Sequence, residues 1–111
     1  MRVCKLIGRE PIVKSSDIEG YDHYVAVDWS ETTMAVARLM PGQAVPTVWE
    51  QRADVAVLQR FLTSLDGRVL LTFEESTAAH WLYGKLLPHV ERLIVCNPSY
   101  NRLLLRGPKN D

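Results

Sequence analysis

The sequence YVAVDW at residues 24–29 decides the fold class. It is rich in β-forming residues and almost wholly apolar until Asp28, so it predicts a central strand with both faces covered. The segment TTMAVARLM at residues 32–40 follows a short turn and alternates between two faces, which predicts a second strand. Residues 43–51 would form a third strand, at an edge of the sheet because Pro46 cannot donate a backbone hydrogen bond. Together these strands predict an antiparallel meander.

After Asp54 the hydrophobic period changes from two to nearly four. Apolar residues then recur at helical spacing, which predicts an amphipathic helix with Asp54 as its N-cap. RVLLTFEE at residues 68–75 predicts a fourth strand, and the helix after it would have Ser76 or Thr77 as its cap and end before Pro88. RLIVCNP at residues 92–98 predicts a fifth strand, and a short last helix would run from Ser99 through Leu105.

The predicted order is therefore β-β-β-α-β-α-β-α, which indicates an α/β fold with a mixed five-stranded sheet and helices on its faces. Right-handed crossovers would place the fourth and fifth strands beside the first, on the side away from the meander. We expect residues 1–20 to form an irregular leader and residues 21–111 to form one domain.

Composition narrows the class of protein. The 111 residues are 47% hydrophobic and 23% charged, as is usual for a folded globular domain. Lys and Arg balance Asp and Glu at 13 each, so any nucleic-acid contact must come from a local basic patch. The two cysteines, Cys4 and Cys96, fit free thiols better than a zinc site. No apolar stretch suits a signal peptide or a membrane span, so we expect a cytoplasmic protein with no membrane partner.

Three acidic residues follow or close apolar segments, namely Asp28, Glu74 and Asp111. In the predicted topology Asp28 and Glu74 end neighbouring strands, which would bring their carboxylates together. Adjacent carboxylates repel, and a hard cation such as Mg²⁺ or Mn²⁺ relieves that repulsion through oxygen ligands. Two such cations can clamp a phosphodiester, although that needs three or four carboxylates. The simpler alternative is that each Asp or Glu forms a turn or helix cap. Glu75 competes with Glu74, and strand alternation allows only one of them to face Asp28.

Three segments, taken in order, resemble a known family: YVAVDWSETTMAVARL, VLLTFEESTAAHWLYGKL and RLIVCNPSYNRLLLRGPKND. They are similar to the N-terminal domain of the DEDD-type insertion-sequence transposases, which are relatives of the pilin-gene invertase Piv. The resemblance covers residues 24–111 and implies an RNase H-like, RuvC-like fold. It also implies that Asp28, Glu74 and Asp111 are catalytic metal ligands for Mg²⁺ or Mn²⁺. A fourth acid would lie three residues beyond Asp111. We therefore expect a domain that is truncated at its C-terminus, with an incomplete last helix.

The resemblance implies that the full-length parent is a DNA recombinase, in some members guided by an RNA. Family members add a downstream domain with a nucleophilic serine. We therefore expect this chain alone to be inactive, and we expect it to form a homo-oligomer that covers sheet surface left bare by the truncation. Arg102, Arg106 and Lys109 could contact nucleic-acid phosphates, or they could form the solvated face of an ordinary amphipathic helix.

Two other functions stay open. The pattern VDWSETT at residues 27–33 superficially fits an actin-like or sugar-kinase-like ATPase. That phosphate loop needs a glycine for close approach of backbone amides, and Trp29, Ser30 and Glu31 supply none. The third alternative is a non-catalytic remnant of an RNase H-like protein. Trp29 and Ser30 follow Asp28 directly; Trp29 is expected to be a packing residue and Ser30 to be a turn hydroxyl. His80 is expected to lie on the surface.

Overall fold

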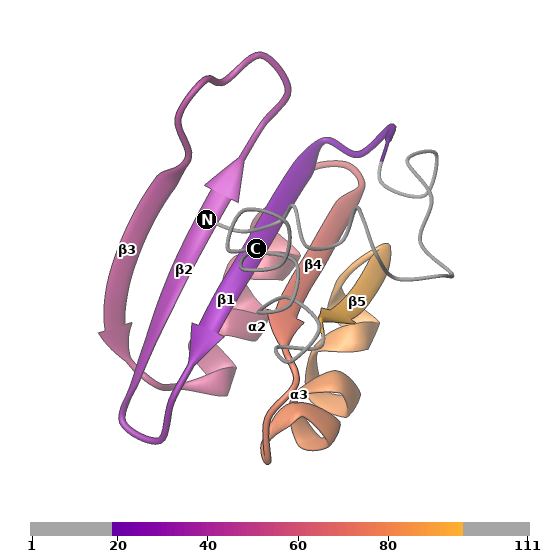
Figure 1. The fold of residues 1–111 in the computed structure, drawn as a ribbon. Coiled ribbons are helices and arrows are strands. Elements are labelled where there is room, and N and C mark those ends of the chain that lie inside the picture. Colours follow the sequence, from indigo (N-terminus) through magenta and orange to yellow (C-terminus); the bar gives the residue numbers. More distant parts are fainter. Residues whose placement is uncertain (1–18, 97–111) are drawn as a thin grey trace, which may run out of the picture.

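A computed structural model describes residues 19–96 of the chain (Figure 1). Within them the order of elements is β-β-β-α-β-α-β, as the sequence predicts. The elements are β1 His23–Trp29, β2 Thr33–Leu39, β3 Thr47–Arg52, α2 Val55–Ser64, β4 Val69–Glu74, α3 Ala79–Leu86, the 3₁₀ turn η2 Leu87–His89 and β5 Arg92–Cys96.

The five strands form one mixed sheet in the order β3-β2-β1-β4-β5. β1 pairs antiparallel with β2, and β2 pairs antiparallel with β3, which gives the predicted meander. β4 pairs parallel with β1, and β5 pairs parallel with β4, on the side away from the meander. This arrangement confirms the predicted fold class, because it is the sheet of the RNase H-like and actin-like folds.

Both described helices cover the same face of the sheet, and in Figure 1 they lie behind it. Residues 19–96 thus supply two α-helices to the sheet, and both lie on one side of it. The reason is topological: the crossovers from β3 to β4 and from β4 to β5 move in the same direction across the sheet. Two right-handed crossovers that advance in one direction place their helices on one side. We call the opposite side, which faces the viewer in Figure 1, the front face.

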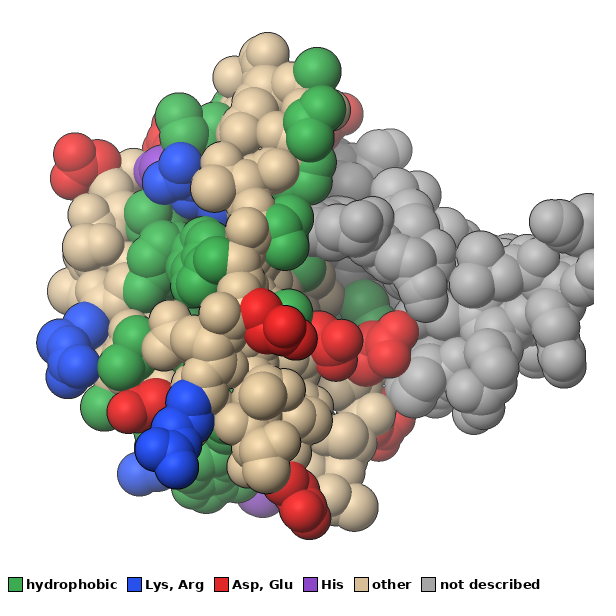
Figure 2. Space-filling model, turned by 90° about the vertical axis from the view of Figure 1, so that its left-hand side faces the viewer, with side chains coloured by type: hydrophobic (Ala, Val, Ile, Leu, Met, Phe, Trp, Pro, Cys, Tyr) green, Lys and Arg blue, Asp and Glu red, His purple; other side chains and the backbone are tan. Residues whose placement is uncertain are grey.

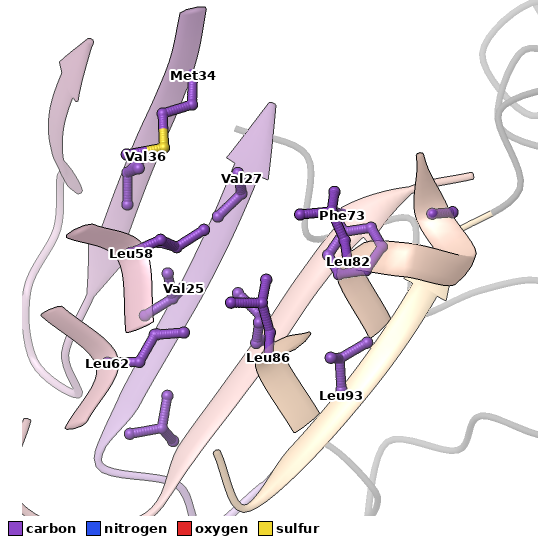
Figure 3. Close-up of a cluster of buried hydrophobic side chains, with 13 residues drawn as sticks. Val25, Val27, Met34, Val36, Leu58, Leu62, Phe73, Leu82, Leu86 and Leu93 are labelled. Carbon is purple, nitrogen blue, oxygen red and sulfur yellow. The ribbon is translucent and has the colours of Figure 1, made fainter. Parts of the chain in front are cut away.

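The main hydrophobic core lies between the sheet and the two helices (Figure 3). Leu58 and Leu62 of α2 and Leu82 and Leu86 of α3 are each at most 1% exposed there. They contact the apolar side chains on the helix-covered face of the sheet, among them Val25, Val27, Met34, Val36, Phe73 and Leu93. Burying side chains of this size contributes about 1.5–3 kcal/mol each, so this core is the main stabilising contact of the fold.

The ends of the helices follow local side-chain chemistry. Asp54 caps α2 as predicted, because its Oδ1 accepts hydrogen bonds from Ala56 N at 3.0 Å and Val57 N at 3.2 Å. The predicted cap of α3 is wrong by one or two residues, since its N-cap is Ala78 and makes no side-chain cap bond. Ser76 instead accepts the Ala78 amide hydrogen at 3.3 Å in the turn before the helix.

Several predictions fall outside residues 19–96. They concern the last helix from Ser99, the leader before residue 19, the third acid Asp111, and the basic residues Arg102, Arg106 and Lys109. In the part of the chain that the structure covers, no helix is both long enough and apolar enough to cross a membrane. Cys96 is buried, and its Sγ lies 3.2 Å from Thr72 Oγ1.

Candidate functional site

The candidate site begins where β1 and β4 end. These parallel strands are in register through Val27 and Phe73, which lie opposite each other. Asp28 follows Val27 and Glu74 follows Phe73, so both acids lie one residue beyond the last matched pair. Adjacent strands are about 4.8 Å apart, so the two backbones run close together at this point. The structure thus places these two residues together as the sequence predicts.

Both acids lie on the front face. Val27 and Phe73 belong to the core cluster under the helices, so the residue after each points to the opposite side. Asp28 and Glu74 are both exposed, which means that the pair does not require a buried charge. The finding that would have excluded a shared cation, two carboxylates on opposite faces of the sheet, is not observed.

A groove of about 540 Å³ lies in front of β1, β2 and β4, and both acids line it. Its volume falls within the range of ligand pockets, roughly 300–1,000 Å³. The lining residues on the front face are Ala26, Asp28, Ala35, Ala37, Val48, Thr72, Glu74 and Cys96, with Glu75 and Ser76 at the end of β4. The groove therefore joins an apolar floor to an acidic end.

Alanines form this floor, and their role was not predicted from the sequence. Ala26 of β1 pairs with Ala37 of β2, and Ala35 pairs with Asp28. Central strand positions usually carry bulky β-branched or aromatic residues, so three small side chains on one face leave a hollow. A signal was available in the sequence, because residues 35 and 37 are the positions of the second strand that alternation assigns to the face of Asp28.

Glu75 and Ser76 continue the wall of the groove past the end of β4. The Glu75 amide donates to the Cys96 carbonyl at 2.6 Å, which holds this loop against β5. Glu75 lies before α3, and the first turn of that helix contains no acidic residue. Alternation gives Glu74 the position on the face of Asp28, while Glu75 borders the same groove from the loop.

The β1–β2 hairpin closes through its own hydroxyl and amide groups. The Ser30 amide and hydroxyl both donate to the Thr33 carbonyl at 2.9 Å, and the Thr33 amide donates back to Ser30 Oγ at 3.1 Å. Ser30 therefore serves as a turn hydroxyl, as predicted. The amides of Ser30 and Thr33 are engaged inside the turn, so they are not presented to a phosphate group.

The aromatic residues near the acids have structural contacts. Trp29 packs against the core, and its ring lies 5.9 Å from that of Trp81 at an angle of 59°, which confirms the predicted packing role. Trp81 remains 46% exposed on α3. His80 is exposed on the same helix, as predicted for a surface histidine. Neither Trp81 nor His80 lines the groove.

Acidic side chains gather on the side of the molecule where β3 lies. Figure 2 views the molecule from the side of β3 and shows Asp and Glu side chains in a row that reaches toward the front face. Among residues 19–96, no group of three or more His, Cys, Asp or Glu side chains is arranged to hold a metal ion. Asp28 and Glu74 both line the groove, and carboxylate oxygens are the kind of ligand that a hard cation prefers.

Comparison with known proteins gives only a distant structural similarity. No protein-family model matches the chain, and no curated protein sequence is significantly similar to it. Among solved structures, the chain is similar to the Ppx/GppA phosphatase of Aquifex aeolicus, with 7% sequence identity and a TM-score of 0.36. The match covers 68% of this chain and 36% of the phosphatase chain, so it spans well under half of that protein. The resemblance to insertion-sequence transposases rests on the three sequence segments.

Proposed function

We propose that the groove is a phosphoryl-transfer site in which Asp28 and Glu74 together hold a divalent cation, Mg²⁺ or Mn²⁺. The observation that supports this most directly is the placement of the two acids on one face, at the ends of adjacent parallel strands, beside a groove of about 540 Å³. Such a cation would neutralise charge on a phosphate oxygen and orient the phosphate group for nucleophilic attack at phosphorus. The protein would supply the two ligands, the wall of the groove and its apolar floor.

In one form of this proposal the substrate is DNA, and the chain is the N-terminal part of a transposase. The three sequence segments support this form, as does a hairpin without the glycine that a nucleotide phosphate loop needs. Two-cation phosphodiester chemistry needs more acids than Asp28 and Glu74, and Asp111 would be the next ligand. With two ligands the site would bind one cation weakly, and catalysis would depend on the acids contributed from outside residues 19–96.

In the second form the substrate is a nucleotide, as in actin-like ATPases. The sheet order is compatible with this form, because the actin-like fold shares it. The phosphate would have to be bound without the Ser30 and Thr33 amides, which donate within their own turn. If neither DNA, nor a nucleotide, nor a divalent cation binds, the domain is non-catalytic.

Calorimetric titration with Mn²⁺ tests the shared part of the proposal. Wild type should bind one cation, and Asp28→Asn or Glu74→Gln should weaken binding at least about tenfold, since each removes a charged ligand. Glu31→Gln is the matched control, because Glu31 is an exposed acid in the adjacent hairpin and does not line the groove. Equal Mn²⁺ binding by Asp28→Asn and the control would refute the site.

Ligand binding then separates the two forms. In the presence of Mg²⁺, the DNA form predicts that a labelled duplex gains fluorescence anisotropy and that ATP does not compete. The nucleotide form predicts calorimetric binding of ATP that Asp28→Asn abolishes. If neither ligand binds while Mn²⁺ does, the site holds a cation without the proposed chemistry.

A further inference from the structure

We infer that the outer edge of β3 is a self-association surface, through which two copies of this chain join their sheets antiparallel in a register fixed by Glu50 and Arg52. β3 is the last strand on its side of the sheet among residues 19–96, and Figure 2 looks onto this edge. A strand edge carries backbone donors and acceptors that can pair with another strand. This inference is independent of the proposed phosphoryl-transfer site.

The hydrogen-bond pattern shows which backbone groups face outward. The Ala53 amide donates to the Thr32 carbonyl at 2.9 Å, so the backbone of Ala53 points toward β2. In an antiparallel ladder the N–H and C=O groups of one residue point to the same side, and that side alternates along the strand. The residues two and four positions back from Ala53 therefore also face β2. The backbone groups of Val48, Glu50 and Arg52 face outward.

Only some registers place these outward residues opposite one another. A register centred on Glu50 sets this residue against its own copy, and like charges directly opposite are destabilising. A register centred on Trp49 sets Pro46 against Arg52. Proline has no N–H, so this pair would lack one backbone hydrogen bond. A register centred on Arg52 sets two Arg residues against each other. The register centred on Gln51 avoids all three conflicts.

In the register centred on Gln51, Glu50 of one copy lies opposite Arg52 of the second, and the twofold axis repeats this pair. Both side chains are exposed and lie on the front face, because their register partners are Ala35 and Thr33. Each pair exchanges two backbone hydrogen bonds. Val48, which is 61% exposed, lies diagonal to Arg52 of the second copy, whose methylene groups can cover it. The contact is self-complementary, as a twofold dimer requires.

The inference fits the rest of the fold. A twofold axis perpendicular to the sheet would place α2 and α3 of both copies on one side and both grooves on the other. Asp28 and Glu74 lie on β1 and β4, away from the β3 edge. Pairing through this edge would therefore join two sheets into one continuous sheet and leave both grooves accessible.

Charge reversal tests the register with the full chain. Sedimentation velocity over a wide concentration range should show a wild-type monomer–dimer equilibrium. Glu50→Arg and Arg52→Glu should each weaken dimerisation about tenfold, because each turns two favourable cross-strand pairs into two repulsive ones. The double variant Glu50→Arg/Arg52→Glu should restore the dimer. Glu31→Arg and Arg60→Glu are controls with the same charge changes on exposed residues away from the edge.

A mixture of the two single variants gives a second, independent measurement. The Glu50→Arg chain presents two Arg residues and the Arg52→Glu chain presents two Glu residues, so together they should form a heterodimer tighter than either homodimer. Circular dichroism would confirm that each variant is folded. The inference is overturned if wild type stays monomeric at all concentrations or if neither single charge reversal weakens dimerisation. It is also overturned if neither the double variant nor the mixture restores dimerisation.

Discussion

Val27 of β1 and Phe73 of β4 lie opposite each other in parallel register, and the next residue of each strand is an acid on the front face. The positions of Asp28 and Glu74 are thus set by the two core residues beside them. Strand alternation turns the apolar pair toward the helices and the acidic pair toward the groove. The same register that builds the core therefore brings two negative charges together at the surface.

Removing one of these charges should stabilise the cation-free protein. Like charges on adjacent strands are destabilising, so we expect Asp28→Asn to raise the free energy of unfolding by about 0.5 kcal/mol in the presence of a chelator. Added Mn²⁺ should stabilise wild type and leave the variant unchanged, which reverses their order of stability. Urea unfolding followed by circular dichroism measures both effects. A variant less stable than wild type in chelator would contradict the predicted repulsion.

Filling the groove should block a large ligand and spare the cation. Ala35 lies on the groove floor opposite Asp28, and its side chain is half-buried. We expect Ala35→Leu to change stability by less than about 1 kcal/mol, because the added methyl groups enter the groove and not the core. Mn²⁺ binding should persist in calorimetry, while binding of DNA or ATP, whichever wild type shows, should fall. Undiminished binding of that ligand would place it outside the groove.

The sheet order was predictable because each strand carried a simple signal. Residues 24–29 are apolar on both faces, residues 32–40 alternate, and Pro46 marks an edge. Right-handed crossovers then leave one position for β4, beside β1, and one for β5. The placement of Asp28 beside Glu74 followed from those rules and from alternation, without knowledge of any side-chain contact.

Other features depend on contacts that no periodic pattern encodes. α3 starts at Ala79 after a turn in which the Ser76 hydroxyl accepts from the Ala78 amide and the Ser76 carbonyl accepts from the Ala79 amide. The groove depends on small residues from two strands meeting at one place, so it required the register of β1 and β2. That register could be argued only after the topology was fixed.

The N-cap of α2 gives a prediction about stability. Asp54 Oδ1 accepts two amide hydrogens from the first turn, and Asp54→Ala leaves both without this acceptor. We expect a loss of about 1 kcal/mol in the free energy of unfolding, equivalent to a decrease in Tm of roughly 4–8 °C. Asp54→Ser should retain most of the stability, because serine is also a good cap. Calorimetric melting compares the three proteins, and equal melting of the alanine and serine variants would show that the cap contributes little.

Gly67 joins α2 to β4 with a φ of +98°, and a Cβ there would stand 2.9 Å from Cβ and 2.7 Å from Cγ of Asp22. The Asp22 carboxylate cannot simply move aside, because its Oδ2 accepts the Arg68 amide hydrogen at 2.7 Å. Gly67→Ala therefore carries both a backbone cost of about 1–2 kcal/mol and a steric conflict. We expect a total loss of roughly 2–4 kcal/mol in the free energy of unfolding.

Gly42 provides the matched control for this position. Its φ is +88°, close to that of Gly67, and a Cβ at this position would meet no atom within 4 Å. Gly42→Ala should therefore cost only the backbone term, about 1–2 kcal/mol. The difference between the two alanine variants in urea unfolding isolates the conflict with Asp22. Equal losses would mean that the Asp22 side chain yields freely, and its bond to Arg68 would then contribute little to holding the start of β4 against β1.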